Sequence, residues 1–212
     1  MNTINYKNYK INIVDDNDSE SPRDWDNLGT MVCFHNRYTL GDKSNLTKDM
    51  FENWNELHKF LKTHGAIIIL PVYLYDHSGI TISCSDNYPY NDRWDSMQVG
   101  FIYANRDAIL KEFNCKNITS KIKDKATHIL KSEINTYDMY LRGEVYGFKI
   151  LDSQDNEIDS CYGFYGNNDL LIEAKSTIDY LIKNKTKSHI IKLKQWIINK
   201  VSLDYRLPLK LV

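Results

Sequence analysis

Alternating apolar and polar residues predict a series of β-strands along the chain. Residues 9–14 alternate in this way, as expected for a strand with one buried face. Residues 29–35 are mostly apolar, which favours a more central strand. Short polar turns separate two further pairs of runs and predict two antiparallel hairpins, 66–75 with 80–84 and 145–151 with 158–165. Another strand is expected at 97–103, and Pro71 should bend or bulge its strand.

Apolar residues recur at steps of three and four in four other segments, as in helices that bury one face. These segments are residues 46–63, 106–113, 120–141 and 170–201. Ser44 or Asn45 is a suitable N-cap for the first helix, and Gly65 and Gly143 suit helix ends. In the last segment lysines alternate with apolar residues, which predicts an apolar face on the core and a basic face outside.

Strands mixed with helices and joined by hairpins predict an α+β fold. We expect a mixed, largely antiparallel sheet of about six strands with helices packed on it, the basic helices being C-terminal. With 212 residues, 42% hydrophobic and 26% charged, the chain has the size and composition of a folded globular protein. The expected organisation is a core domain over residues 1–166 and a helical extension over residues 167–212 packed on that core.

The formal net charge of -1 conceals two oppositely charged segments. Six carboxylates share residues 15–26 with one cation, Arg23: Asp15, Asp16, Asp18, Glu20, Asp24 and Asp26. Residues 183–200 contain no carboxylate and six lysines: Lys183, Lys185, Lys187, Lys192, Lys194 and Lys200. The acidic segment is either a partner-binding surface or a solvated loop. The lysines, the first five above all, are either a nucleic-acid or anion contact or a solvated face, and the near-neutral net charge is unlike that of a dedicated DNA-binding protein.

No cofactor, metal or membrane partner is expected. The acidic segment begins like a calcium loop but has Ser21 where the turn requires glycine, and the cysteines and histidines lack a zinc-ligand spacing. We expect neither export nor a membrane span, because residues 1–7 lack a charged stretch followed by an apolar run and no window has the length needed to cross a bilayer. Four widely spaced cysteines favour reduced thiols and a cytoplasmic location: Cys33, Cys84, Cys115 and Cys161.

Histidine and aspartate residues at predicted strand ends form a candidate catalytic site, because strand ends aim polar side chains into clefts. The residues are His35, Asp42, Asp76, His77 and Asp95. His77 would act as general base, Asp42 or Asp95 would orient it, and Arg37 would stabilise an anion. The alternative is that the Asp, Ser and Gly residues there only form turns.

Aromatic residues in the predicted loops form a candidate protein-binding surface, because Tyr and Trp are enriched at the centres of interfaces. They are Tyr88, Tyr90 and Trp94. The alternative is that these rings cover the edges of the core.

Five stretches of the chain, residues 21–42, 71–79, 94–103, 136–143 and 159–166, are distinctive. They resemble a protein family of bacteriophages and related mobile elements with no established activity, and the resemblance covers most of residues 21–166. Because accessory phage proteins of this size often antagonise host immunity, it implies an anti-defence protein, similar to an anti-CRISPR protein, that binds and inhibits a host immune effector.

The implied partner is a host defence complex, such as a CRISPR effector, in the cytoplasm of an infected bacterial host. A binding protein is favoured over an enzyme. The alternatives are a small phage enzyme that acts on a nucleotide or nucleic acid, and an accessory protein that binds DNA.

Overall fold

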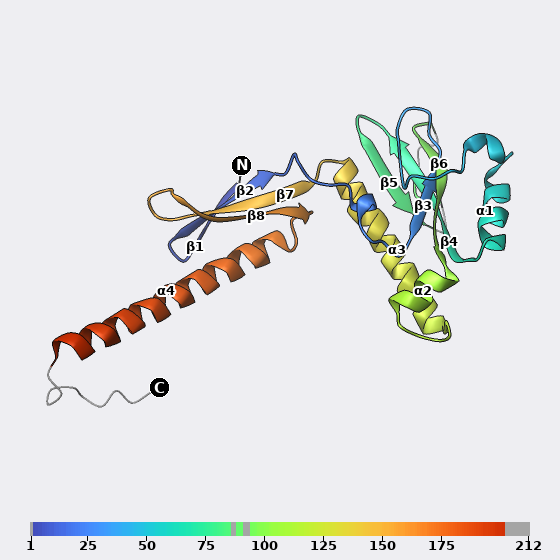
Figure 1. Ribbon diagram of the computed structural model, residues 1–212. Coiled ribbons are helices and arrows are strands. Elements are labelled where there is room, and N and C mark those ends of the chain that lie inside the picture. Colours follow the sequence, from blue (N-terminus) through green and yellow to red (C-terminus); the bar gives the residue numbers. More distant parts are fainter. Residues whose placement is uncertain (1, 86–87, 91–93, 202–212) are drawn as a thin grey trace. The chain divides into compact units, whose positions relative to one another are not determined.

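The computed structural model describes residues 2–85, 88–90 and 94–201, and the chain divides into two compact units (Figure 1). The terminal unit combines the two ends of the chain, Met1–Asp15 and Tyr146–Val212. The central unit is Asp16–Val145. These boundaries differ from the expected division at residue 166, because a strand near the start of the chain pairs with one that follows the central unit.

The terminal unit contains a four-stranded antiparallel sheet of order β1-β2-β7-β8. Its strands are β1 (Asn2–Tyr6), β2 (Tyr9–Asp15), β7 (Val145–Leu151) and β8 (Glu157–Tyr165). The expected strand at 9–14 and the hairpin of β7 and β8 are confirmed. Strand β1 was not expected; it pairs with β2 across a tight turn at Lys7 and Asn8, which both have positive φ.

Helix α4 (Leu170–Lys200) packs on this sheet through its first turns only. Leu170, Ala174 and Ile178 are fully buried in one cluster with Ile11 and Phe148. Farther along the helix, all side chains from residue 185 to residue 196 are exposed. The expectation that the lysine-rich segment packs an apolar face on the core is therefore wrong for this half of α4. The sheet ends before the helix does.

The central unit contains a second four-stranded antiparallel sheet, of order β3-β6-β4-β5. Its strands are β3 (Thr30–Cys33), β4 (Ala66–Asp76), β5 (Ile80–Cys84) and β6 (Ser96–Asn105). The α+β class is confirmed, but the described strands form two sheets rather than one. Strand β3 lies at an edge and not at the centre, since within the sheet it pairs with β6 alone. The bulge expected near Pro71 lies between Val72 and Tyr73.

Helices cover both faces of the central sheet (Figure 1). On one face α3 (Ser120–Leu141), with the short α2 (Arg106–Glu112) beside it, packs against alternate residues of β4, such as Leu70 and Leu74. On the other face α1 (Trp54–Thr63) buries Leu57 and Leu61. The helix expected from residue 46 begins only at Trp54 because the side chain of Asn53 caps it, accepting from the Glu56 N–H at 3.1 Å. A separate 3₁₀ turn, η2 (Lys48–Met50), precedes it.

Candidate functional site

Three of the five predicted catalytic residues meet where β4 ends. The Nδ1–H of His77 donates to Asp95 Oδ2 at 2.7 Å, which leaves Nε2 as the basic nitrogen of the ring. The backbone N–H of Asp76 donates to the carbonyl of Asp95 at 2.7 Å and holds the two segments together. His77 is 61% exposed. This pair has the geometry of a histidine oriented by a carboxylate.

His35 lies close to these residues but forms no bond with the His77 and Asp95 pair. Its Nδ1 accepts from the backbone N–H groups of Arg37 and Tyr38, both at 3.2 Å, so in the neutral ring the proton is on Nε2. The Asp76 carboxylate accepts from the Tyr38 hydroxyl and forms an ion pair with Arg37 at 3.1 Å. Arg37 therefore neutralises Asp76, in addition to any role toward an anion.

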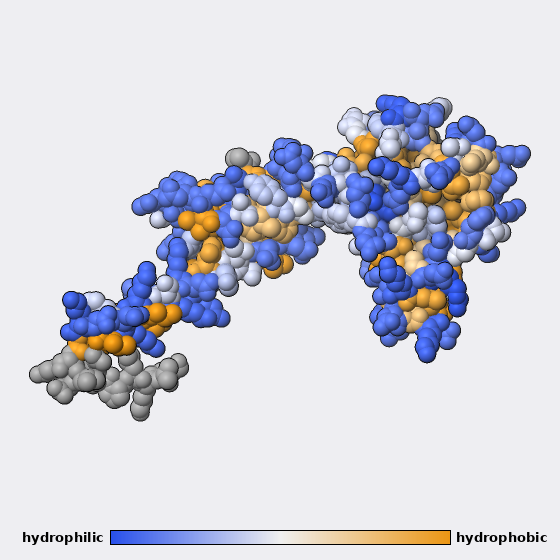
Figure 2. All heavy atoms as spheres, viewed as in Figure 1, coloured by the Kyte–Doolittle hydropathy of each residue, from blue (hydrophilic) through white to orange (hydrophobic). Residues whose placement is uncertain are grey.

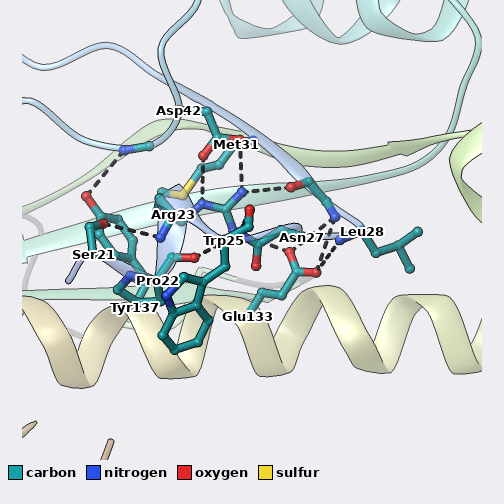
Figure 3. Close-up of polar contacts among 12 residues, drawn as sticks. Ser21, Pro22, Arg23, Trp25, Asn27, Leu28, Met31, Asp42, Glu133 and Tyr137 are labelled. Atoms are coloured by element: carbon teal, nitrogen blue, oxygen red, sulfur yellow. Dashed lines mark hydrogen bonds and ion pairs between the residues drawn. The ribbon is translucent and has the colours of Figure 1, made fainter. Parts of the chain in front are cut away.

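Asp42 is not part of this group, and its assignment to the candidate catalytic site is corrected. It binds Arg23, whose side chain is only 4% exposed, through two bonds of 2.7 and 2.9 Å (Figure 3). The same guanidinium donates to the Gly29 carbonyl and forms an ion pair with Glu133 of α3. Burial raises the pKa of Glu133, although the Gly29 N–H and the Arg23 charge oppose the rise. Asp42 therefore fixes β3 and its flanking loops to α3.

The predicted interface aromatics have different environments. Tyr90 stacks on Tyr75 with ring centroids 5.3 Å apart, and Tyr88 contacts Tyr73 edge-on at 5.0 Å. Burial raises the pKa of Tyr90 to about 12. These rings lie against Tyr73 and Tyr75 of β4, and Tyr88 is still 40% exposed. Trp94 is 95% exposed.

A groove on the central unit adjoins this site. It consists of two cavities of about 410 and 320 Å³ that share Phe34, Lys48 and Met97. We call them the aromatic half and the polar half. The aromatic half is otherwise lined by Phe51, Glu52, Asn53, Trp54, Leu57 and Gln98. The polar half is otherwise lined by His35, Asn36, Arg37, Leu74, Asp76, Trp94 and Asp95.

Sequence reasoning missed the aromatic half of the groove. Residues 48–53 line it because α1 begins at Trp54, whereas a helix from residue 46 would have placed them on a regular helical face. The sequence does not distinguish a helix that begins near residue 46 from one that begins at Trp54, because Ser44, Asn45 and Asn53 are all suitable N-caps. The available signal was the concentration of aromatic residues on both sides of Asn53.

The acidic segment is exposed around one buried cation. Asp15 ends β2 in the terminal unit, and the remaining acidic residues belong to the central unit. Asp16 is half-buried, while the others are exposed: Asp18, Glu20, Asp24 and Asp26. Because Arg23 is buried and paired with Asp42, the segment presents carboxylates without its only cation. Trp25 is exposed between Asp24 and Asp26.

The lysines of α4 lie along its projecting half, where Figure 2 shows hydrophobic residues among the hydrophilic ones. Four of the five assigned lysines are exposed, and their ammonium groups form no ion pair or hydrogen bond within the described part of the chain: Lys183, Lys187, Lys192 and Lys194. Lys185 instead donates to the Tyr9 hydroxyl at 3.0 Å and lies over its ring. Exposed hydrophobic residues accompany these lysines on several sides of the helix: Ile190, Ile191, Leu193, Trp196 and Ile198. The lysines therefore do not form a separate basic face.

The chain matches no protein-family model, no curated protein and no solved structure. Its function is therefore inferred from its own residues. No helix in the described part of the chain is long and apolar enough to cross a membrane.

Proposed function

We propose that the protein is an anti-defence protein that binds and inhibits a host immune effector, similar to an anti-CRISPR protein. The carrying observation is the acidic surface formed by Asp18, Glu20, Asp24 and Asp26, whose neighbouring cation is buried. The carboxylates on this surface resemble a row of phosphates in charge. A nucleic-acid-binding groove on an effector nuclease has the complementary charge.

Trp25 supplies the apolar contact that such a surface needs. Its ring is exposed within the acidic surface, and partly exposed tryptophans are frequent energetic centres of protein interfaces. Carboxylates speed and orient the encounter with a basic partner, while an aromatic anchor lengthens the life of the complex. The choice of a host defence effector as that partner comes from the sequence resemblance alone, which no family model matches.

Charge reversal of the acidic surface tests this function. We expect the variant with Asp18→Lys, Glu20→Lys, Asp24→Lys and Asp26→Lys to bind its effector about 100-fold more weakly, because attraction becomes repulsion at four positions. The measurement is inhibition of DNA cleavage by a panel of purified, guide-loaded CRISPR nucleases, with the native protein and the variant titrated in parallel.

A matched control reverses four exposed carboxylates elsewhere on the central unit: Asp49, Asp107, Glu112 and Asp124. This control should inhibit like the native protein. If the native protein inhibits none of the nucleases, and captures no defence protein from the lysate of an infected host, the proposed function is wrong. If the acidic-surface variant inhibits as well as the native protein, binding does not use this surface.

The pair of His77 and Asp95 favours a second candidate function, that of an enzyme acting on a nucleotide or nucleic acid. A histidine whose Nδ1–H is fixed by a carboxylate at 2.7 Å has its Nε2 available as a general base. If this function is correct, His77→Gln should lower the rate of conversion by about 10²- to 10⁴-fold without loss of folding. The rate is measured by chromatography of nucleotides and oligonucleotides incubated with the protein.

His128→Gln is the control for this test, because His128 is exposed on α3, away from β4. Catalysis also predicts inhibition of a target by less than one molecule of protein per target. Strictly stoichiometric inhibition that persists in His77→Gln would exclude the enzymatic alternative.

A further inference from the structure

The aromatic half of the groove provides flat surfaces and hydrogen-bonding groups. Phe34 lies nearly parallel to both Trp54 and Phe51, with interplanar angles of 9° and 20°. Leu57, which also lines this half, is fully buried. All three rings are half-buried, and the parts of them that line the cavity offer flat surfaces on which a nucleotide base can stack, because every base has a flat π-face.

The side-chain amides of Asn53 and Gln98 line this half, and each retains a hydrogen-bonding group for a ligand. Gln98 Nε2 donates to the Gly100 carbonyl at 3.3 Å, so Gln98 Oε1 remains an acceptor. Asn53 Oδ1 accepts from Glu56 N–H, so Asn53 Nδ2 remains a donor. A donor and an acceptor beside aromatic rings match the edge of a heterocyclic base. The Glu52 carboxylate also lines this half and is suited to accept from ribose hydroxyls.

The polar half contains two cations, Lys48 and Arg37, together with two carboxylates, Asp76 and Asp95. Lys48 lines both halves, is exposed, and its ammonium group forms no hydrogen bond or ion pair with any residue that the structure describes. Arg37 has a 71% exposed side chain and uses one guanidinium nitrogen for Asp76, so its remaining N–H groups are available. His35 contributes its Nε2–H. Ammonium and guanidinium groups at the end of a stacking surface are suited to bind phosphate.

Both carboxylates of the polar half have partners of their own. Asp76 is bound by Arg37 and by the Tyr38 hydroxyl, and Asp95 is bound by His77. Lys48 has no such carboxylate partner among the described residues. The formal charges of these four groups cancel, so an anion is favoured here only through direct contact with the ammonium of Lys48 and the remaining N–H groups of Arg37.

We propose that the groove binds a nucleoside 5′-monophosphate, with the base against Phe34 and Trp54 and the phosphate between Lys48 and Arg37. Each half is within the range of cavity volumes that hold small ligands. A purely apolar ligand would leave Lys48 and Arg37 unused, and inorganic phosphate would leave the aromatic half empty. This site is separate from the acidic surface, and it does not depend on the His77 and Asp95 pair being catalytic.

Calorimetric titration of the full chain with AMP, GMP, CMP and UMP tests the proposal. At least one should bind with a Kd below about 1 mM, and the matching nucleoside and inorganic phosphate should each bind about tenfold more weakly or worse. Lys48→Glu should weaken binding of the nucleotide by about tenfold or more, since it replaces the attraction by repulsion. Lys43→Glu, which changes an exposed lysine outside the groove, should leave binding unchanged.

The methyl resonance of Met97 reports the position of the ligand, because this side chain lines both halves, while Met139 lies on α3. The nucleotide should shift the Met97 signal and leave the Met139 signal in place. Three results would overturn the assignment: no binding of any of the four nucleotides at about 10 mM, equal binding by inorganic phosphate, or equal binding by the folded Lys48→Glu variant.

Discussion

Arg23→Leu is expected to lower the free energy of unfolding of the central unit by ~3–5 kcal/mol, because it leaves two carboxylates without their buried cation. Asp42 would lose two bonds, and Glu133 would lose its ion pair while burial still raises its pKa. The Gly29 carbonyl would lose a donor at 2.7 Å. Three segments would then separate more easily: η1 (Pro22–Asp24), the start of β3, and α3.

Urea denaturation followed by tryptophan fluorescence measures this loss, since Trp25, Trp54 and Trp94 belong to the central unit and only Trp196 does not. Arg142→Leu is the matched control. Arg142 also pairs with two carboxylates, Asp138 and Glu144, but its side chain is 40% exposed, so we expect a loss of ~0–1 kcal/mol. If the two variants lose the same free energy of unfolding, the burial of Arg23 does not determine how much it contributes to stability.

Local patterns in the sequence were sufficient for α3 and for two of the hairpins, but not for the start of α1 or for the hairpin of β1 and β2. Helix α3 has the expected bounds, 120–141, because its apolar stripe continues through all its turns and Thr119 and Gly143 flank it. The two hairpins were also predicted, since each joins neighbouring runs across a short polar turn. In these elements the residues that determine the structure are close together in the sequence.

Pairing between distant segments could not be predicted. Strand β2 pairs with β7, with Lys10 opposite Leu151, and β3 pairs with β6, with Thr30 opposite Tyr103. Alternation shows which side chains share a face but does not identify the neighbouring strand. The strands were therefore assigned to a single sheet, and the chain was divided at residue 166 instead of between Asp16–Val145 and the two ends.

The candidate site was only partly predicted, because it also depends on contacts between segments that are distant in the sequence. Asp76, His77 and Asp95 come together because β4 pairs with β6, which places the end of β4 beside Asp95, the residue just before β6. Asp42 was grouped with them as a polar residue after a strand, but its partner is Arg23, and a buried ion pair has no periodic signal in sequence. The groove was missed because it depends on the residue at which α1 begins.

Gly100→Ala is expected to destabilise the central unit by more than ~3 kcal/mol through a direct clash. Gly100 lies in β6 between Cys33 of β3 and Val72 of β4. A Cβ atom there would be 1.9 Å from the Val32 carbonyl oxygen and 2.8 Å from the Cys33 Cα. These are backbone atoms, so relief requires β3 to move away from β6. Movement of β3 would also displace Phe34, whose N–H donates to the Val99 carbonyl at 2.7 Å, and would thereby deform the groove.

Gly65→Ala separates this clash from the ordinary cost of replacing a glycine. Gly65 has a φ of +93°, and a Cβ atom added to it would meet nothing within 4 Å beyond its chain neighbours, so alanine there meets only the backbone cost, ~1–2 kcal/mol. Urea denaturation of both variants compares the two costs, and faster hydrogen exchange of the β3 amides in Gly100→Ala would locate the change. If Gly65→Ala costs as much as Gly100→Ala, or if β3 exchange is unchanged, the close approach of β3 to β6 is not what requires glycine at position 100.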